Sequence, residues 1–94
     1  MAGPLTVEDF RARVGEAFVV HAGGGVELEL TEARGLGESY REREAFSLLF
    51  RGPAQPVMEQ ATYRLGNAQL GDVEIFIVPV ARSEAGTDYE AIFT

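Results

Sequence analysis

The sequence predicts an all-β, mainly antiparallel domain in which six strands form a small barrel or a sandwich, preceded by one short N-terminal α-helix. After Gly15 the chain consists of short apolar segments separated by glycine- and proline-containing turns, which is typical of antiparallel strands connected in sequence. Helical periodicity and capping signals occur only before that glycine. A length of 94 residues allows one domain, residues 1–94, with the helix at about 6–14 and the β region at about 16–94.

The N-terminal helix is predicted from the signals at its two ends. Thr6 is a suitable N-cap, and Asp9 three residues later gives a pattern close to a capping box. Gly15 is a typical helix terminator. The apolar residues of the segment recur at helical spacing on one face, namely Val7, Phe10 and Val14. Because two helical turns are not stable alone in water, this face must pack against the rest of the domain.

Six strands are expected after the helix. They cover residues 17–21, 26–30, 45–50, 59–65, 73–80 and 89–93. The glycines at 23–25 supply the backbone freedom that a tight hairpin turn needs. The strand that follows them alternates apolar and acidic residues, as expected for a strand with one face in solvent. In the third strand the large apolar residues share one face, which we expect to lie in the core: Phe46, Leu48 and Phe50.

The connection between the second and third strands is longer than the others. It covers residues 33–44, and loops of this length tend to be functional or mobile. The alternative is that both strands extend into this segment and end in a solvated hairpin tip. Base rates for loop lengths favour the extended hairpin.

The charge and the cysteine count exclude several classes of function. Fifteen acidic residues stand against eight arginines and no lysine, which gives a formal net charge of −7. This balance argues against nucleic-acid and anionic-membrane partners, because both require clustered positive charge. The absence of cysteine excludes disulfides, thiolate metal sites and cysteine nucleophiles. The longest apolar run, residues 75–81, is too short to span a membrane, and a signal-peptide pattern is lacking, so a cytoplasmic location is expected.

His21 is the only histidine, and it is the one candidate for acid–base chemistry. A histidine-based metal site normally has a second histidine or a cysteine. General-base chemistry would require a carboxylate partner, for which Glu27 across the predicted hairpin is a candidate. We expect His21 to be a strand-end residue near solvent with no such role.

Two pairs of carboxylates have the spacing of neighbours on one face of a strand. These are Asp72 with Glu74 and Asp88 with Glu90. Calcium requires six to eight oxygen ligands, usually from a loop dense in carboxylates, and the sequence has no such loop. A solvated strand face is the commoner role of such residues. The sequence therefore predicts no catalytic, cofactor-binding or metal-binding residues.

The surplus of apolar side chains on the strands is more informative. Residues 73–80 carry large apolar side chains on both faces, and two residues of other strands oppose the inward sets of their own strands. The interface candidates are the members of this second set, Leu49, Phe76, Val78 and Ile92. They need cover either from a second sheet layer in the monomer, the commoner arrangement, or from self-association. The terminal strand 89–93 is a possible edge that would pair with a second copy, unless it closes the sheet by pairing with the first strand.

Five segments of the chain resemble a known family. They are 46–53, 60–65, 70–71, 75–80 and 89–93. In this order they are similar to a family of small bacterial proteins, about as long as this chain, catalogued only as a domain of unknown function. The resemblance covers Phe10 to Phe93, with Ala61 where a glycine looks more usual. Members are associated with phage-tail-collar-like proteins, so the resemblance implies a role in a tail-like or surface assembly, and it carries no site residues over.

These observations favour a non-enzymatic interaction or assembly module whose partner is a protein, either another chain or a second copy of this one. One alternative is a small-molecule-binding β-barrel, which would need an emptier interior than the aromatic content predicts. The aromatic residues expected to fill the core are Phe18, Phe46, Phe50, Tyr63, Phe76 and Phe93. The other alternative is a small enzyme that uses His21 and carboxylates. No cofactor is expected.

Overall fold

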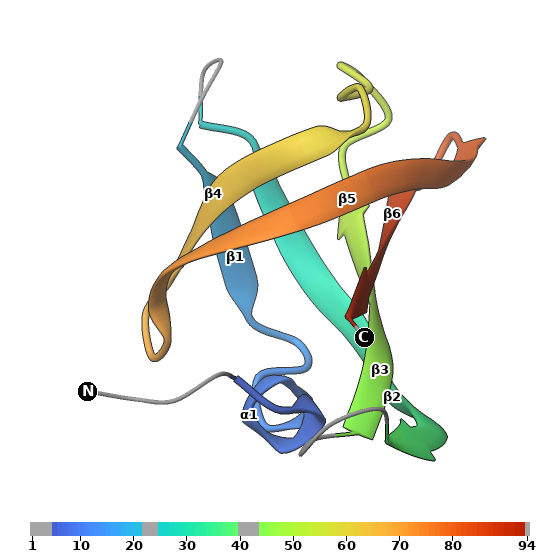
Figure 1. Ribbon diagram of the computed structural model, residues 1–94. Helices are drawn as coiled ribbons and strands as arrows, with labels where there is room; N and C mark the ends of the chain where they lie inside the picture. Colours follow the sequence, from blue (N-terminus) through green and yellow to red (C-terminus); the bar gives the residue numbers. More distant parts are fainter. Residues whose placement is uncertain (1–4, 22–24, 40–43, 94) are drawn as a thin grey trace.

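A computed structural model describes residues 5–21, 25–39 and 44–93 of the chain (Figure 1). In this described part, one helix precedes six strands. The elements are α1 (Val7–Arg11), β1 (Ala17–Val20), β2 (Glu27–Ser39), β3 (Glu44–Gly52), β4 (Ala61–Asn67), β5 (Gly71–Ser83) and β6 (Gly86–Phe93). The predicted fold class is therefore confirmed, with one short helix followed by strands.

The strands form a closed antiparallel barrel in the order β1-β2-β3-β6-β5-β4. The ring closes between β1 and β4, where Val19 pairs with Gly66. The barrel is thus the correct one of the two predicted architectures. Figure 1 shows the six strands surrounding a common interior, with α1 at one end.

The expectation that the last strand is an edge, or pairs with the first strand, is wrong. β6 lies between β3 and β5 and pairs with both. A tight turn from Ser83 to Gly86 places β6 beside β5. Its other side pairs with β3 from Phe46–Phe93 to Gly52–Thr87, which buries the inward side chains of both strands.

The long connection predicted at residues 33–44 is for the most part strand. β2 continues to Ser39, and its last pair with β3 is Ser39–Glu44. Residues 40–43 lie outside the described part. The predicted extension of the strands into this segment is therefore confirmed, whereas the predicted solvated tip falls on residues outside the described part. Cross-strand packing explains the extension, because the small residues Ala33 and Gly35 pair with the large core residues of β3.

The helix begins as predicted but ends earlier. The backbone N–H of Thr6 donates a hydrogen bond to the Asp9 carboxylate at 2.8 Å, as in a capping box. α1 ends at Arg11, and the chain then turns so that the Gly15 N–H donates to the Leu30 carbonyl at 2.7 Å. Val14 falls in this turn and is 46% exposed, so its prediction as part of the packed face is wrong.

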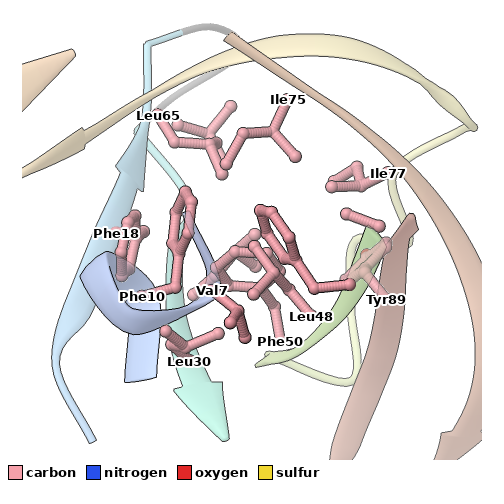
Figure 2. Packing of buried hydrophobic residues seen from close by; sticks show 14 residues of the cluster. Val7, Phe10, Phe18, Leu30, Leu48, Phe50, Leu65, Ile75, Ile77 and Tyr89 are labelled. Atoms are coloured by element: carbon pink, nitrogen blue, oxygen red, sulfur yellow. The ribbon is translucent and has the colours of Figure 1, made fainter. Parts of the chain in front are cut away.

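Aromatic rings fill the end of the barrel that α1 covers (Figure 2). Phe10 of α1 is fully buried, and its ring centroid lies 6.4 Å from that of Phe18 and 5.8 Å from those of Phe46 and Phe93. The buried cluster consists of Val7, Phe10, Phe18, Val20, Leu28, Leu30, Phe46, Leu48, Phe50, Leu65, Ile75, Ile77, Tyr89 and Ala91. This helix therefore completes the core that the strands leave open.

Candidate protein interface on the outer barrel face

Large apolar side chains gather on the outside of three neighbouring strands, β3, β6 and β5. Phe76, Val80 and Ile92 are each at least half exposed, at 51%, 50% and 58%. Leu49 and Val78 are half-buried on the same face. We call these residues the outer apolar surface: Leu49, Phe76, Val78, Val80 and Ile92.

The pairing register brings Leu49 and Val78 together, and the other members of this surface lie further along the same strands. Leu49 of β3 and Val78 of β5 both pair with Glu90 of β6, so the three side chains form one row across the barrel wall. Phe76 lies two residues from Val78 along β5, and Ile92 lies two residues from Glu90 along β6. Because strand side chains alternate between faces, all five point away from the core.

All four interface candidates therefore lie on one outer face, but the expected cover is absent from the described chain. The sequence analysis favours a second sheet layer that covers these side chains, and this expectation is wrong. In a closed barrel all strands share one interior, so the second face of each strand faces outward. Phe76 was also expected to fill the core, and it points outward instead. Phe10 and Tyr89 take part in filling the interior.

Glu90 is a charged residue within the outer apolar surface. It is half-buried between Leu49 and Val78, and it has no ion pair among the described residues. Its neighbour Asp88 differs, because the Asp88 carboxylate accepts a hydrogen bond from Arg51 Nε at 2.9 Å. This hydrogen bond and the charge of Asp88 raise the pKa of Arg51. Of the predicted carboxylate pair, Asp88 is thus in an ion pair, whereas Glu90 lies among apolar side chains.

His21 pairs with Asp72 rather than with the predicted Glu27. Its Nε2 lies 3.0 Å from Asp72 Oδ1, and both side chains are about half exposed to solvent. The pair lies above Gly66, where a Cβ atom would stand 2.6 Å from His21 Nε2. Barrel closure between β1 and β4 creates this contact, because it carries His21 over β4 to the neighbouring β5. The expected position of His21 near solvent at a strand end is confirmed.

The last of the four candidate carboxylates, Glu74, pairs with an arginine. Glu74 lies 3.6 Å from Arg64 on the neighbouring strand. Since Asp72 contacts His21, the predicted pair Asp72–Glu74 does not act as a unit. Across the described residues, no group of three or more histidine and acidic side chains has the arrangement of a metal site.

No helix in the described part of the chain is long and apolar enough to cross a membrane. An open surface depression of about 340 Å³ lies where Ala17, Glu29 and Arg51 come together. The interior itself holds the buried aromatic and aliphatic cluster described above.

Replacing His21 by glutamine is expected to leave the free energy of unfolding within about 0.5 kcal/mol of wild type, as for most surface substitutions. Urea denaturation measures this difference. Metal analysis of protein purified without chelator is expected to find no stoichiometric ion. One tightly held divalent ion per chain, lost in His21→Gln, would assign a metal role to the His21–Asp72 pair.

Together, the fold and the surface define a small six-stranded antiparallel barrel with a packed interior and an apolar outer face. The sequence matches the family described as Domain of unknown function (DUF6916) over residues 5–93, and the chain belongs to this family. No curated protein and no solved structure matches the chain. The match confirms the domain of unknown function that the sequence resembled.

Proposed function

We propose that this protein is a non-enzymatic interaction or assembly module that binds another protein through the outer apolar surface. The observation that carries the proposal is the exposure of Phe76, Val80 and Ile92 on adjacent strands. Burying apolar surface stabilises a complex by about 25 cal/mol per Å² before the costs of association are subtracted. Apolar patches exposed on one face of a protein often mark protein-binding sites.

The two alternative functions have less support. A small-molecule-binding barrel needs space inside, whereas the rings of Phe10, Phe46 and Phe93 pack against one another at the end beneath α1. An enzyme built on His21 would need a nucleophile or a bound group beside the His21–Asp72 pair. The neighbours of that pair on β4 and β5 are Gly66, Arg64 and Glu74.

The family resemblance suggests where the partner belongs. We propose that the partner is a component of a tail-like or surface assembly, as the association with phage-tail-collar-like proteins implies. The acidic character of the chain, with a net charge of −7, favours a basic or neutral partner over an acidic one.

A second copy of the chain is the less favoured partner. A two-fold contact centred on the outer apolar surface would bring two half-buried Glu90 carboxylates together, and like charges in a buried contact are costly. Light scattering across a dilution series is therefore expected to find a monomer. A dimer that Ile92→Glu dissociates without unfolding would make self-association the function of this face.

The test of the proposed function compares two double variants of the tagged chain. Phe76→Ser with Ile92→Ser removes the two most exposed members of the outer apolar surface. Val14→Ser with Val57→Ser removes two apolar side chains that are 46% and 40% exposed elsewhere. We expect the first variant to bind the partner isolated with wild type at least about tenfold more weakly, and the second to bind unchanged. Equal binding by both variants would contradict the proposal.

A further inference from the structure

The ladder between β5 and β6 is incomplete. β5 begins at Gly71 and β6 ends at Phe93, but their pairing extends only as far as Val78–Glu90. Figure 1 shows the two strands separating beyond this point, with β5 running toward β4 and β6 running toward the C-terminal end of the chain. Among the described strands, residues 71–77 of β5 therefore have a neighbour on one side only, which is β4.

The hydrogen-bond pattern shows which backbone groups face the open side of β5. The His21 N–H donates to the Arg64 carbonyl at 2.9 Å, so the backbone polar groups of Arg64 point toward β1. Arg64 lies opposite Glu74 in the β4–β5 ladder. Because the backbone groups of Arg64 point toward β1, the two residues form a non-hydrogen-bonded pair, in which the backbone N–H and C=O groups of both residues point away from the partner strand. The N–H and C=O groups of Glu74 thus face the open edge. By alternation, those of Asp72 and Phe76 face it as well.

These backbone groups have no paired strand beside them in the described chain. In the described chain, Asp72, Glu74 and Phe76 make no backbone–backbone hydrogen bond outside the strand ladders, and all three residues are exposed. The side chain of Phe76 stands beside the edge and belongs to the outer apolar surface. An unpaired strand edge with an apolar side chain next to it is a template for pairing with another chain.

We propose that an extended segment of another protein adds to β5 along Asp72, Glu74 and Phe76 as an additional antiparallel or parallel strand. Main-chain hydrogen bonds would supply affinity, and alternate side chains of the segment would supply specificity. This inference rests on the proposed function, and it specifies how the partner binds beside the outer apolar surface.

The side chains along the edge indicate the chemistry of the segment. Asp72, Glu74 and Phe76 project on the same outer face, so the segment places one side chain next to each of them. Asp72 contacts His21 and Glu74 lies 3.6 Å from Arg64, but both carboxylates are more than half exposed, so basic side chains of the segment can approach them. An apolar side chain fits beside Phe76. A second copy fits poorly, because antiparallel self-pairing centred on Glu74 sets Glu74 against Glu74.

The first measurement is amide hydrogen exchange of the free protein by NMR. The amides of Asp72, Glu74 and Phe76 are expected to exchange at least about tenfold faster than those of Val73, Ile75 and Ile77, which face β4. Equal protection of the two sets would overturn the inference, because the edge would then be occupied. Protection of the first set that rises with protein concentration would overturn it in favour of self-pairing.

The second measurement selects binders from a random twelve-residue peptide library displayed on phage. Selected peptides are expected to carry two basic residues and one apolar residue at every second position, and a synthetic copy is expected to slow exchange at Asp72, Glu74 and Phe76. Glu74→Pro removes the central N–H of the edge, and proline is tolerated at unpaired edges. It is expected to abolish peptide binding, whereas Glu74→Ala retains the N–H and weakens binding less.

The controls separate this inference from the proposed function. Leu49→Ser alters the outer apolar surface away from the edge and is expected to bind the selected peptide unchanged. Peptides that bind without slowing exchange at the three edge amides would overturn strand addition and leave the proposed function standing. Strand addition would also be overturned, and the proposed function would stand, if the library yielded no binder while the Phe76→Ser, Ile92→Ser variant lost the partner. If Glu74→Pro fails to fold, amide exchange of the wild-type protein with bound peptide tests strand addition, which predicts slower exchange at Asp72, Glu74 and Phe76.

Discussion

Phe10→Ala is expected to lower the free energy of unfolding by about 3 kcal/mol, the usual cost of removing a buried phenylalanine side chain. Phe10 is fully buried, and its ring contacts rings from β1, β3 and β6. Its loss leaves a cavity at the end of the barrel that α1 covers. Because small domains are stable by about 5–15 kcal/mol, the variant should still fold.

Urea denaturation of the wild type, Phe10→Ala and Val14→Ala measures this effect. Val14 lies on the same N-terminal segment but is 46% exposed, so Val14→Ala is expected to change stability by less than about 0.5 kcal/mol. Equal effects of the two substitutions would show that α1 is not docked on the core.

Gly86→Ala is expected to destabilise the fold by about 3 kcal/mol, for two separate reasons. Gly86 has a φ of +149°, which residues with a side chain rarely adopt. A Cβ atom at this position would also lie 2.4 Å from the Gly52 carbonyl oxygen, which is part of the β3 backbone. The turn that places β6 beside β5 would have to shift to relieve this clash.

Gly71→Ala is the matched control for the clash. Gly71 also has a positive φ, at +76°, but nothing lies within 4 Å of a Cβ atom built there. Its substitution is expected to cost about 1 kcal/mol, since only the backbone conformation is unfavourable. Thermal or urea unfolding of both variants gives the comparison, and a Gly71→Ala effect as large as that of Gly86→Ala would exclude the steric explanation.

The parts of the fold that depend on local sequence were predictable. Alternation alone places Phe46, Leu48 and Phe50 on the buried face of β3, because side-chain direction in a strand has a period of two. The capping pattern of Thr6 and Asp9 likewise identifies the start of α1. These features depend on neighbours within a few residues along the chain.

Features that depend on which strands are neighbours were not predictable. The edge assigned to residues 89–93 and the pairing of His21 with Glu27 both failed, because they require the order of strands in the ring. The exposure of Val14 follows from the turn that Gly15 makes toward Leu30, a contact with a distant strand. Long-range pairing decides each of these positions, and periodicity does not report it.

The candidate site shows the same division. The outward direction of Leu49, Phe76, Val78 and Ile92 follows from alternation within their strands, so the sequence could identify them. The position of Leu49 and Val78 on either side of Glu90 follows from the register of β3, β6 and β5. The open edge of β5 could not be foreseen, because it arises where the ladder with β6 stops short of the strand ends.

Photo-crosslinking in the native cell tests the central claim most directly, with a benzophenone amino acid in place of Phe76. Phe76 is 51% exposed, and it lies on both the outer apolar surface and the open edge of β5. The same amino acid in place of Val14, 46% exposed near α1, is the control. We predict a covalent adduct with a different protein at position 76 and none at position 14. No adduct at position 76, or the same adducts at both positions, would contradict a protein interface on this face.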